Sequence, residues 1–243
     1  MDRYEDCTNL DRILEDYPGL CAAVVLDVET TGLDPVEYPS GTRNYILQLS
    51  IISAHNGLKI YDGYFKPRKR TWPEAEAINH ITWDMVKDSP TFRKELPRIQ
   101  EIISDARVII GYNIGFDRGF LEINGVDFSK TRYWIDVMED FAVWNGDLHS
   151  YHHSFTWQKL TKAAKAAGFD WSRFPPHNSL SDCMATLHVA RWLQERNKTD
   201  GWLMYYPPCY YIDYQEEYGC SDCELHPCLI RGKRRLATVT GGE

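Results

Sequence analysis

The sequence predicts an α/β domain in which helices cover a mixed sheet. A continuous apolar run of strand length, 21–26, opens the sheet. Two further strands, Tyr45–Ala54 and Leu58–Phe65, are joined at Asn56-Gly57, a dipeptide typical of a β-hairpin. An antiparallel meander therefore follows the first strand. Strands then alternate with helices, and this alternation predicts parallel pairing in the second half.

The remaining elements follow from apolar spacing and from helix start and stop residues. Leu10, Ile13 and Leu14 predict a short helical arm within residues 1–20, which ends before Pro18. Short helices are expected in the segment after the meander. These short helices are expected within 71–106. Further strands are expected at 108–110 and 133–135, and further helices at 115–123, 136–144, 156–167 and 179–194.

Composition excludes several classes of protein. The 243 residues are 43% hydrophobic and 26% charged, which is enough apolar material for one sizeable core. No run is long and apolar enough to span a membrane, and the acidic start lacks a secretory signal, so we expect a soluble, cytoplasmic protein without membrane partners. The net charge of −8 argues against broad coating of duplex DNA, yet it permits a cleft for one strand end where bound cations offset the acids.

Two carboxylates mark the end of the first predicted strand. Asp27 and Glu29 are two residues apart, so an extended backbone places both side chains on one face, about 6 to 7 Å apart at the backbone. Carboxylates that close repel each other unless a cation lies between them, and Mg²⁺ prefers such hard oxygen ligands. The alternative interpretation is a strand end with two solvated acids.

Three motifs resemble those of one enzyme superfamily. The run Leu26-Asp-Val-Glu-Thr-Thr-Gly-Leu-Asp34 resembles the first motif of the DEDDh 3′-to-5′ exonuclease superfamily, typified by the proofreading subunit of bacterial replicative DNA polymerase. Asn113-Ile-Gly-Phe-Asp117 resembles the second motif, and His177-Asn-Ser-Leu-Ser-Asp182 the third. Ala77-Ile-Asn-His-Ile-Thr82 resembles the family's connecting segment, and the resemblance covers about residues 21–195.

This resemblance implies a fold, a reaction and a set of catalytic residues. The fold would be RNase H-like, with a five-stranded sheet in the order 3-2-1-4-5. The enzyme would use two Mg²⁺ or Mn²⁺ ions per active site to release nucleoside monophosphates from a DNA 3′ end. By carry-over, His177 would be the general base, and the metal ligands would be Asp27, Glu29, Asp117 and Asp182.

Substrate contacts are also implied by the resemblance. The backbone around Thr30 and Thr31 would meet the terminal sugar, Leu33 would wedge near the terminal bases, and Asn113 and Phe116 would line the cleft. The partner would be a single-stranded or frayed 3′ end. Two alternatives remain at this stage: an exonuclease for RNA or short oligoribonucleotides, and a catalytically inactive module that binds nucleic acid.

Some of these residues also fit ordinary structural roles. Ser179 with Asp182 forms a helix N-cap box, and Asp117 lies in a first helical turn, where the helix dipole favours an acid. The run Lys66-Pro-Arg-Lys-Arg70 either guides a phosphate backbone or is a solvated loop. Trp72 and Trp83 are expected to pack in the core more often than to stack on bases.

The tail has a different composition from the rest of the chain. The sequence divides into an arm (1–20), an exonuclease domain (21–195) and a tail rich in Cys and Tyr (196–243). The tail holds either a structural Zn²⁺ or reduced thiols that pack on the core. The candidate zinc ligands are Cys209, Cys220, Cys223, His226 and Cys228.

Overall fold

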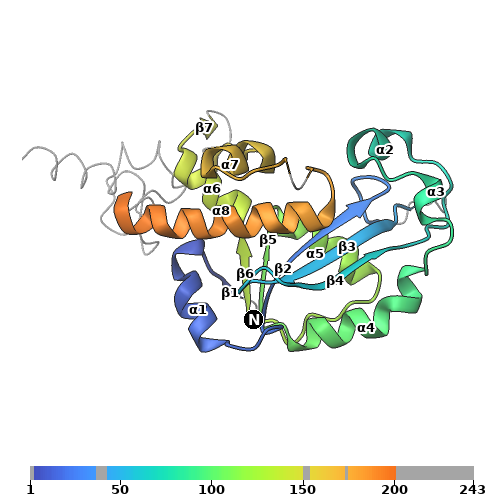
Figure 1. Cartoon of the computed structure of the whole chain (residues 1–243), viewed down its shortest axis with the longest axis horizontal. Helices are drawn as coiled ribbons and strands as arrows, with labels where there is room; N and C mark the ends of the chain where they lie inside the picture. Colours follow the sequence, from blue (N-terminus) through green and yellow to red (C-terminus); the bar gives the residue numbers. More distant parts are fainter. Residues whose placement is uncertain (1–2, 37–42, 150–153, 173–174, 201–243) are drawn as a thin grey trace, which may run out of the picture.

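The computed structural model describes residues 3–36, 43–149, 154–172 and 175–200, which form a central sheet with helices on both faces (Figure 1). The strands are β1 (Arg3–Tyr4), β2 (Ala23–Thr30), β3 (Ile46–Ser53), β4 (Lys59–Tyr64), β5 (Val108–Gly111), β6 (Tyr133–Asp136), β7 (Leu148–His149) and β8 (Ser154–Phe155). The helices are η1 (Cys7–Asn9), α1 (Leu10–Asp16), α2 (Pro73–Asn79), α3 (Trp83–Val86), α4 (Phe92–Asp105), α5 (Ile114–Ile123), α6 (Val137–Asn145), α7 (Leu160–Ala167) and α8 (Ser179–Asp200).

The sheet confirms the predicted strand order and adds one strand. Its order is β1-β6-β5-β2-β3-β4, and the five predicted strands occupy the expected 3-2-1-4-5 arrangement within it. β2, β3 and β4 pair antiparallel, whereas β2, β5 and β6 pair parallel. The extra strand β1 pairs parallel with β6 at the edge. Two residues are too few to give a periodic pattern, so the sequence did not predict this strand.

Side-chain alternation along β2 decides which face carries the acids. Val24 and Leu26 pack in one core cluster with α4 and α5, whereas Val25 packs in a second cluster with α8. Because successive side chains of a strand point to opposite faces, Asp27 and Glu29 continue the row of Val25. The two carboxylates therefore lie on the face that α8 covers.

The first turn of α8 is fixed to the middle of the sheet. The Ser179 hydroxyl lies 2.7 Å from the Ser50 hydroxyl of β3, and both residues are fully buried. The Ser179 backbone N–H also donates to Gln48 Oε1 at 3.4 Å. These polar contacts between buried groups set the position of α8 along the sheet, and they bring Asp182 of the same turn to the end of β2.

The arm and the later helices join the same core. Cys7, Leu10 and Ile13 are buried against α8, which agrees with the predicted helical arm. α7 begins at Leu160 rather than Thr156, and α8 continues past residue 195. Within the described residues no helix is both long enough and apolar enough to cross a membrane. The described cysteines are Cys7, Cys21 and Cys183, and all three are free thiols.

Candidate active site

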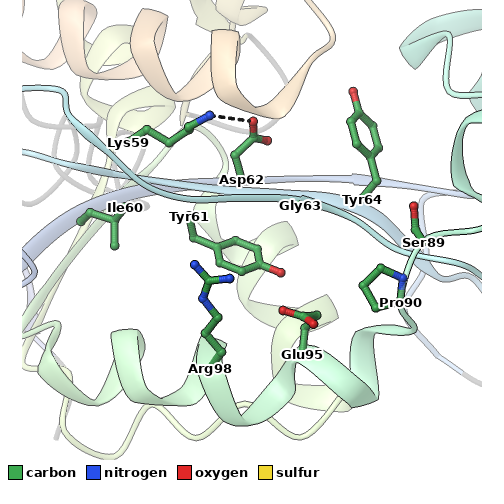
Figure 2. A pocket seen from close by; sticks show the side chains of 10 residues that line it. All are labelled: Lys59, Ile60, Tyr61, Asp62, Gly63, Tyr64, Ser89, Pro90, Glu95 and Arg98. Carbon is green, nitrogen blue, oxygen red and sulfur yellow. Dashed lines mark ion pairs between the residues drawn. The ribbon is translucent and has the colours of Figure 1, made fainter.

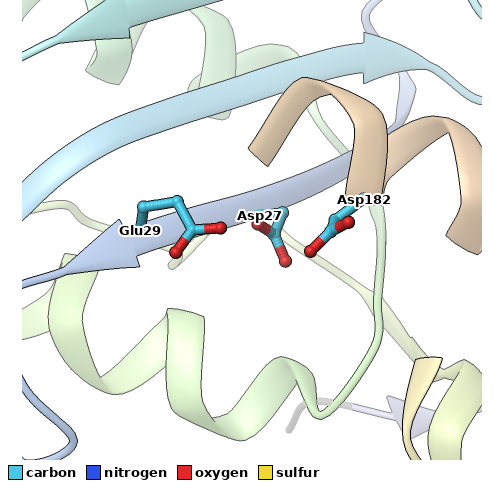
Figure 3. A group of neighbouring side chains, drawn as sticks. All are labelled: Asp27, Glu29 and Asp182. Atoms are coloured by element: carbon cyan, nitrogen blue, oxygen red, sulfur yellow. The ribbon is translucent and has the colours of Figure 1, made fainter. Parts of the chain in front are cut away.

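Three carboxylates converge where β2 ends beneath the first turns of α8 (Figure 3). Asp27 and Glu29 extend from β2, and Asp182 extends from α8. One carboxylate oxygen from each residue lies within 4.8 Å of the others, and all three residues are partly buried. The structure therefore brings together three of the four acids that the sequence predicted as metal ligands.

Burial and mutual repulsion destabilise the charged forms of this cluster. Burial, as the larger cause, and the nearby Asp182 charge together raise the pKa of Glu29 to about 8. Burial raises the pKa of Asp182 to about 7, against a hydrogen bond from the backbone N–H of His177. The pKa of Asp27 is raised well above its ordinary value, first by burial and then by the surrounding acids. A positive charge placed among them would reverse these shifts.

A carboxylate oxygen without a hydrogen-bond partner also indicates that a cation belongs among these acids. Asp182 Oδ1 is buried and has no hydrogen-bond partner among the described residues. Buried polar oxygens without a partner are rare, and such an atom needs an explanation. The three acids offer hard oxygen donors, which suit Mg²⁺ or Mn²⁺ better than soft metals. The cluster thus fits a divalent cation.

Asp117 lies beside the cluster and also supports the backbone of β2. It belongs to the first turn of α5, is only 2% exposed, and its Oδ1 accepts the Val28 N–H at 2.8 Å. That N–H is available because β5 pairs with β2 only over Ala23–Val25. Burial raises the pKa of Asp117 well above its ordinary value, and this acid in turn raises the pKa of Asp27.

Asp136 orients the starts of two helices, in agreement with the structural role that its strand-to-helix position suggests. Its carboxylate accepts backbone N–H groups from Asn113 at 2.9 Å and from Ile114 at 3.1 Å, at the start of α5. It also accepts the Met138 N–H at 3.0 Å as the N-cap of α6. Asp136 therefore fixes the helix that carries Asp117.

His177 lies at the rim of the cluster. Its φ of 61° is left-handed, and its side chain is exposed, while its backbone N–H donates to Asp182. Partial desolvation lowers the pKa of His177, and His80 and Lys159 lower it further. A lowered pKa leaves the imidazole neutral near pH 7, which is the form that can accept a proton.

The predicted substrate residues after Glu29 divide into buried and exposed positions. Thr30 and Thr31 are buried, and Thr31 Oγ1 accepts the Tyr45 N–H at 2.9 Å, so both threonines hold the turn together. Leu33 is 84% exposed. Between them, a Cβ on Gly32 would lie 2.5 Å from Oδ1 of Asn44, so a larger residue at this position would displace the Asn44 side chain.

The predicted cleft residues on α5 also differ from each other. Asn113, the N-cap residue, is exposed and has a left-handed φ of 62°. Phe116 is partly buried, and its ring centroid lies 5.0 Å from that of Phe120. The exposed Asn113 can therefore meet a ligand directly, whereas Phe116 also contributes to the core.

Two residues near the acids had no role assigned from sequence. Asn79, at the end of α2, is 6% exposed, donates to the Thr30 carbonyl at 3.1 Å, and also donates to the Glu29 carboxylate. Lys159 precedes α7 and lies close enough to influence His177. A buried asparagine within the matched connecting segment was the available signal for Asn79, but spacing alone does not identify its partner.

A separate pocket of about 440 Å³ lies between β4 and the start of α4 (Figure 2). It does not include the three carboxylates. Its own charges are largely paired, since Lys59 lies 3.6 Å from Asp62 and the Arg98 guanidinium lies 5.4 Å from the centre of the Tyr61 ring. Its lining residues are Lys59, Ile60, Tyr61, Asp62, Gly63, Tyr64, Ser89, Pro90, Glu95 and Arg98.

The candidate zinc ligands of the tail lie outside the described residues, so the zinc interpretation stays a prediction. These residues are Cys209, Cys220, Cys223, His226 and Cys228.

Known proteins share parts of this sequence and this fold. The chain is 35% identical over 101 residues to a PolC-type DNA polymerase III of Staphylococcus aureus, a match that covers 41% of this chain and 6% of the polymerase. The match to the Staphylococcus epidermidis enzyme is 33% over 114 residues, covering 46% of this chain and 7% of the polymerase. The chain thus spans less than a tenth of the length of these relatives.

Solved structures support the fold. A zinc-bound complex of E. coli ExoI with ssDNA superposes with a TM-score of 0.56 at 19% identity, over 75% of this chain and 42% of that one. The 3′-exonuclease that recognises the histone mRNA stem-loop gives a TM-score of 0.50 at 15% identity, over 76% of this chain and 69% of that one. The family model RNase_T, described as Exonuclease, matches residues 24–190. Because this match covers well over half of the sequence, the chain belongs to the RNase_T exonuclease family.

Proposed function

We propose that this chain is a metal-dependent 3′-to-5′ exonuclease that removes nucleoside monophosphates from single-stranded or frayed DNA ends. The observation that carries the proposal is the convergence of Asp27, Glu29 and Asp182 at the end of β2, in a chain of the exonuclease family. The S. aureus relative is a DNA polymerase, which favours DNA as the substrate class.

In this proposal, Asp27, Glu29 and Asp182 would hold one divalent cation, and Asp27 with Asp117 would support a second one. Bound divalent cations would supply Lewis-acid charge that lowers the pKa of the attacking water and stabilises the leaving alkoxide. Asn79 keeps Glu29 in position through its amide. Asp136 keeps Asp117 in position by holding the start of α5.

His177 is proposed as the general base. Its lowered pKa keeps the imidazole neutral near pH 7, so the ring can take a proton from the attacking water. Its position at the exposed rim leaves it accessible to a strand end. Lys159 beside it is a cation that can contact the phosphate under attack.

Degradation of end-labelled strands tests this function. Full-length protein with Mg²⁺ or Mn²⁺ is incubated with matched DNA and RNA oligonucleotides labelled at the 5′ or the 3′ end. We expect a descending ladder from 5′-labelled DNA and immediate release of labelled mononucleotide from 3′-labelled DNA. Faster degradation of RNA would transfer the proposal to an RNA exonuclease. Binding without hydrolysis under all metal conditions would favour the inactive binding module.

Two further parts of the proposal concern cell compartment and tail. Because Cys7, Cys21 and Cys183 are free thiols, we place the enzyme in a reducing compartment such as the cytoplasm. The tail is proposed to hold a structural Zn²⁺ through Cys220, Cys223 and two of the other three candidates. Zinc that remains near one per chain after dialysis would support this site, and its absence would favour packed thiols.

A further inference from the structure

The segment Lys66–Arg70, here named the basic loop, connects β4 to α2. Its four cationic residues are exposed, although the chain as a whole has a net charge of −8. Within the described part of the chain, none of these cations forms an ion pair, whereas other exposed lysines such as Lys162 and Lys198 do. An unpaired group of four positive charges on an acidic protein is suited to an anionic ligand.

The basic loop is anchored at both ends. Phe65 and Pro67 are buried, and the Lys66 N–H donates to the Pro90 carbonyl at 3.0 Å. At the other end, Trp72 is 2% exposed and its Nε1 donates to the Ile81 carbonyl at 2.7 Å. The exposed cations are therefore carried on a backbone that is already held in place, which lowers the entropy cost of binding.

Trp83 holds two of these cations. Lys66 Nζ lies 5.8 Å and the Arg70 guanidinium 5.6 Å from the centre of the Trp83 ring. These distances are within the range of cation–π attraction. Because the ring already contacts two cations, Trp83 orients the charges of the basic loop instead of offering a free stacking platform to a base.

The strand register places the basic loop near the carboxylates and on their face of the sheet. Glu29 of β2 is opposite Gln48 of β3, which is opposite Tyr64 of β4. Two strand spacings correspond to about 10 Å. Lys66 follows Tyr64 by two residues, and the ladder continues between them through the Phe65 N–H, which donates to the Leu47 carbonyl at 2.8 Å.

Helix α2 gives an independent estimate of the same separation. It begins next to Trp72, at the end of the basic loop, and it ends at Asn79, which contacts Glu29. A helix of 7 residues is about 10 Å long. Because Lys66 lies two residues beyond Tyr64 and Arg70 three residues before Pro73, the two routes place the ends of the loop about 12 to 15 Å from the acidic cluster.

We propose that the basic loop binds the phosphodiester backbone of the substrate strand upstream of the terminal nucleotide. The proposal rests on the proposed function for the position of the 3′ end. Phosphates of a stacked strand repeat every 3.4 Å along its axis, so a distance of about 12 to 15 Å corresponds to about four phosphates. The contact is to phosphate, so it serves DNA and RNA alike and gives longer strands an advantage over dinucleotides.

The test compares two triple variants of the full chain. One is Arg68→Ala/Lys69→Ala/Arg70→Ala. The matched control, Arg12→Ala/Lys130→Ala/Arg132→Ala, removes the same number of positive charges from exposed residues on α1 and just before β6, at the other edge of the sheet. Both are made in the Asp182→Ala background to prevent hydrolysis. Fluorescence anisotropy with a fluorescein-labelled 20-nucleotide oligothymidylate then gives Kd over a series of salt concentrations.

The expected difference lies in the salt dependence. Each phosphate contact on a single strand contributes about 0.7 to the slope of log Kd against log salt concentration, so the loop variant should lose about 2 from this slope. The control variant should keep the wild-type slope. Arg68→Lys/Arg70→Lys, which retains the charges, should also keep it. Equal slopes for the loop and control variants, with both folded by circular dichroism, would overturn the proposal.

A kinetic measurement separates this proposal from the proposed function. In the otherwise wild-type enzyme, the loop variant should lower kcat/KM for the 20-nucleotide strand by at least about tenfold. The reference substrate is a thymidine dinucleotide, which is too short to reach the loop, so its hydrolysis should be unchanged in the loop variant. An equal loss on both substrates would contradict the proposal. Failure of the wild-type enzyme to hydrolyse either substrate would refute the proposed function. The anisotropy measurement would still test whether the basic loop binds the phosphate backbone.

Discussion

Two regions of the molecule bury carboxyl groups, and they differ in how those groups are satisfied. In the acidic cluster, burial raises the pKa of Asp182 to about 7. In α6, burial raises the pKa of Asp140 to about 8. Asp140 Oδ2 accepts the Cys7 N–H at 2.9 Å and thereby fastens the N-terminal arm. Asp182 Oδ1, by contrast, is buried without a partner among the described residues.

This comparison shows which property identifies a ligand site. A raised pKa occurs in both regions, so the shift alone does not distinguish a structural acid from a functional one. What differs is the unmet hydrogen-bonding capacity and the close approach of the carboxylate oxygens to one another. Asp182 has carboxylate oxygens of Asp27 and Glu29 within 4.8 Å, whereas Asp140, whose pKa is also raised by the charges of Asp6 and Asp136, accepts a hydrogen bond from the Cys7 backbone. The acidic cluster is therefore incomplete without a cation, and the Asp140 contact is complete.

The largest expected effect separates the two regions by activity. Asp27→Ala, Glu29→Ala or Asp182→Ala should lower exonuclease activity by at least about 10⁴-fold, equivalent to about 5 kcal/mol, because the cation loses a ligand. Their metal-free unfolding temperature should stay the same or rise slightly, since repulsion is relieved. Asp140→Asn should retain activity. Loss of activity in Asp140→Asn, or near-full activity in Asp27→Ala, would contradict the assignment.

A smaller effect is expected at His177. His177→Ala should slow hydrolysis by about 10² to 10⁴-fold while nucleic-acid binding is retained. In the wild type, the rate should fall as pH drops below the lowered pKa of His177, because the protonated ring cannot accept a proton. Pre-steady-state rates of the wild type and the variant are measured against pH with saturating Mg²⁺. The variant should not show the fall in rate at low pH. An identical pH profile in both proteins would assign His177 to binding instead.

Most of the fold could be predicted because the periodic elements are long. β3 and β4 are of ordinary strand length and flank an Asn-Gly turn, where Gly57 has a positive φ of 74° that favours glycine. β1 could not be predicted because it depends entirely on pairing with β6. α7 begins later than expected, since Thr156 donates its N–H to the Asp147 carbonyl at 2.7 Å outside any helix.

Less of the site could be predicted from residue types. The convergence of Asp27, Glu29 and Asp182 followed from strand parity and from the motifs, and the structure places them together. The partners of Asn79 could not be found in this way, because its contact with Glu29 joins α2 to β2 through tertiary packing. The Asp140 contact spans 133 residues of sequence and carries no local pattern.

The stability of the Asp140 contact gives the third prediction. At pH 6, Asp140→Ala should lower the free energy of unfolding by about 1 to 3 kcal/mol, because the buried Cys7 N–H loses its acceptor. Asp140→Asn keeps an acceptor oxygen and should remain close to wild type at this pH. Urea unfolding at pH 6 measures both changes. Equal losses in the two variants would mean that the carboxyl group itself, and not an acceptor, holds the arm.

The last prediction uses pH and Mg²⁺ to tell the two regions apart. Glu29, Asp182 and Asp140 have folded pKa values raised to about 7 or 8, so their contribution to stability is present at low pH and is lost as pH rises through these values. Without divalent cations, the unfolding temperature should therefore fall between pH 6 and pH 9.

Mg²⁺ binds ionised carboxylates, so it should raise the unfolding temperature more at pH 9 than at pH 6. At a Mg²⁺ concentration of about 100 times Kd, the gain is about 2.7 kcal/mol, which corresponds to roughly 5 to 10 °C for a chain of this size. Asp140→Asn should keep this Mg²⁺ response and lose only part of the metal-free pH dependence, whereas Asp182→Ala should lose the response. A Mg²⁺ shift that persists in Asp182→Ala would place the cation outside the acidic cluster.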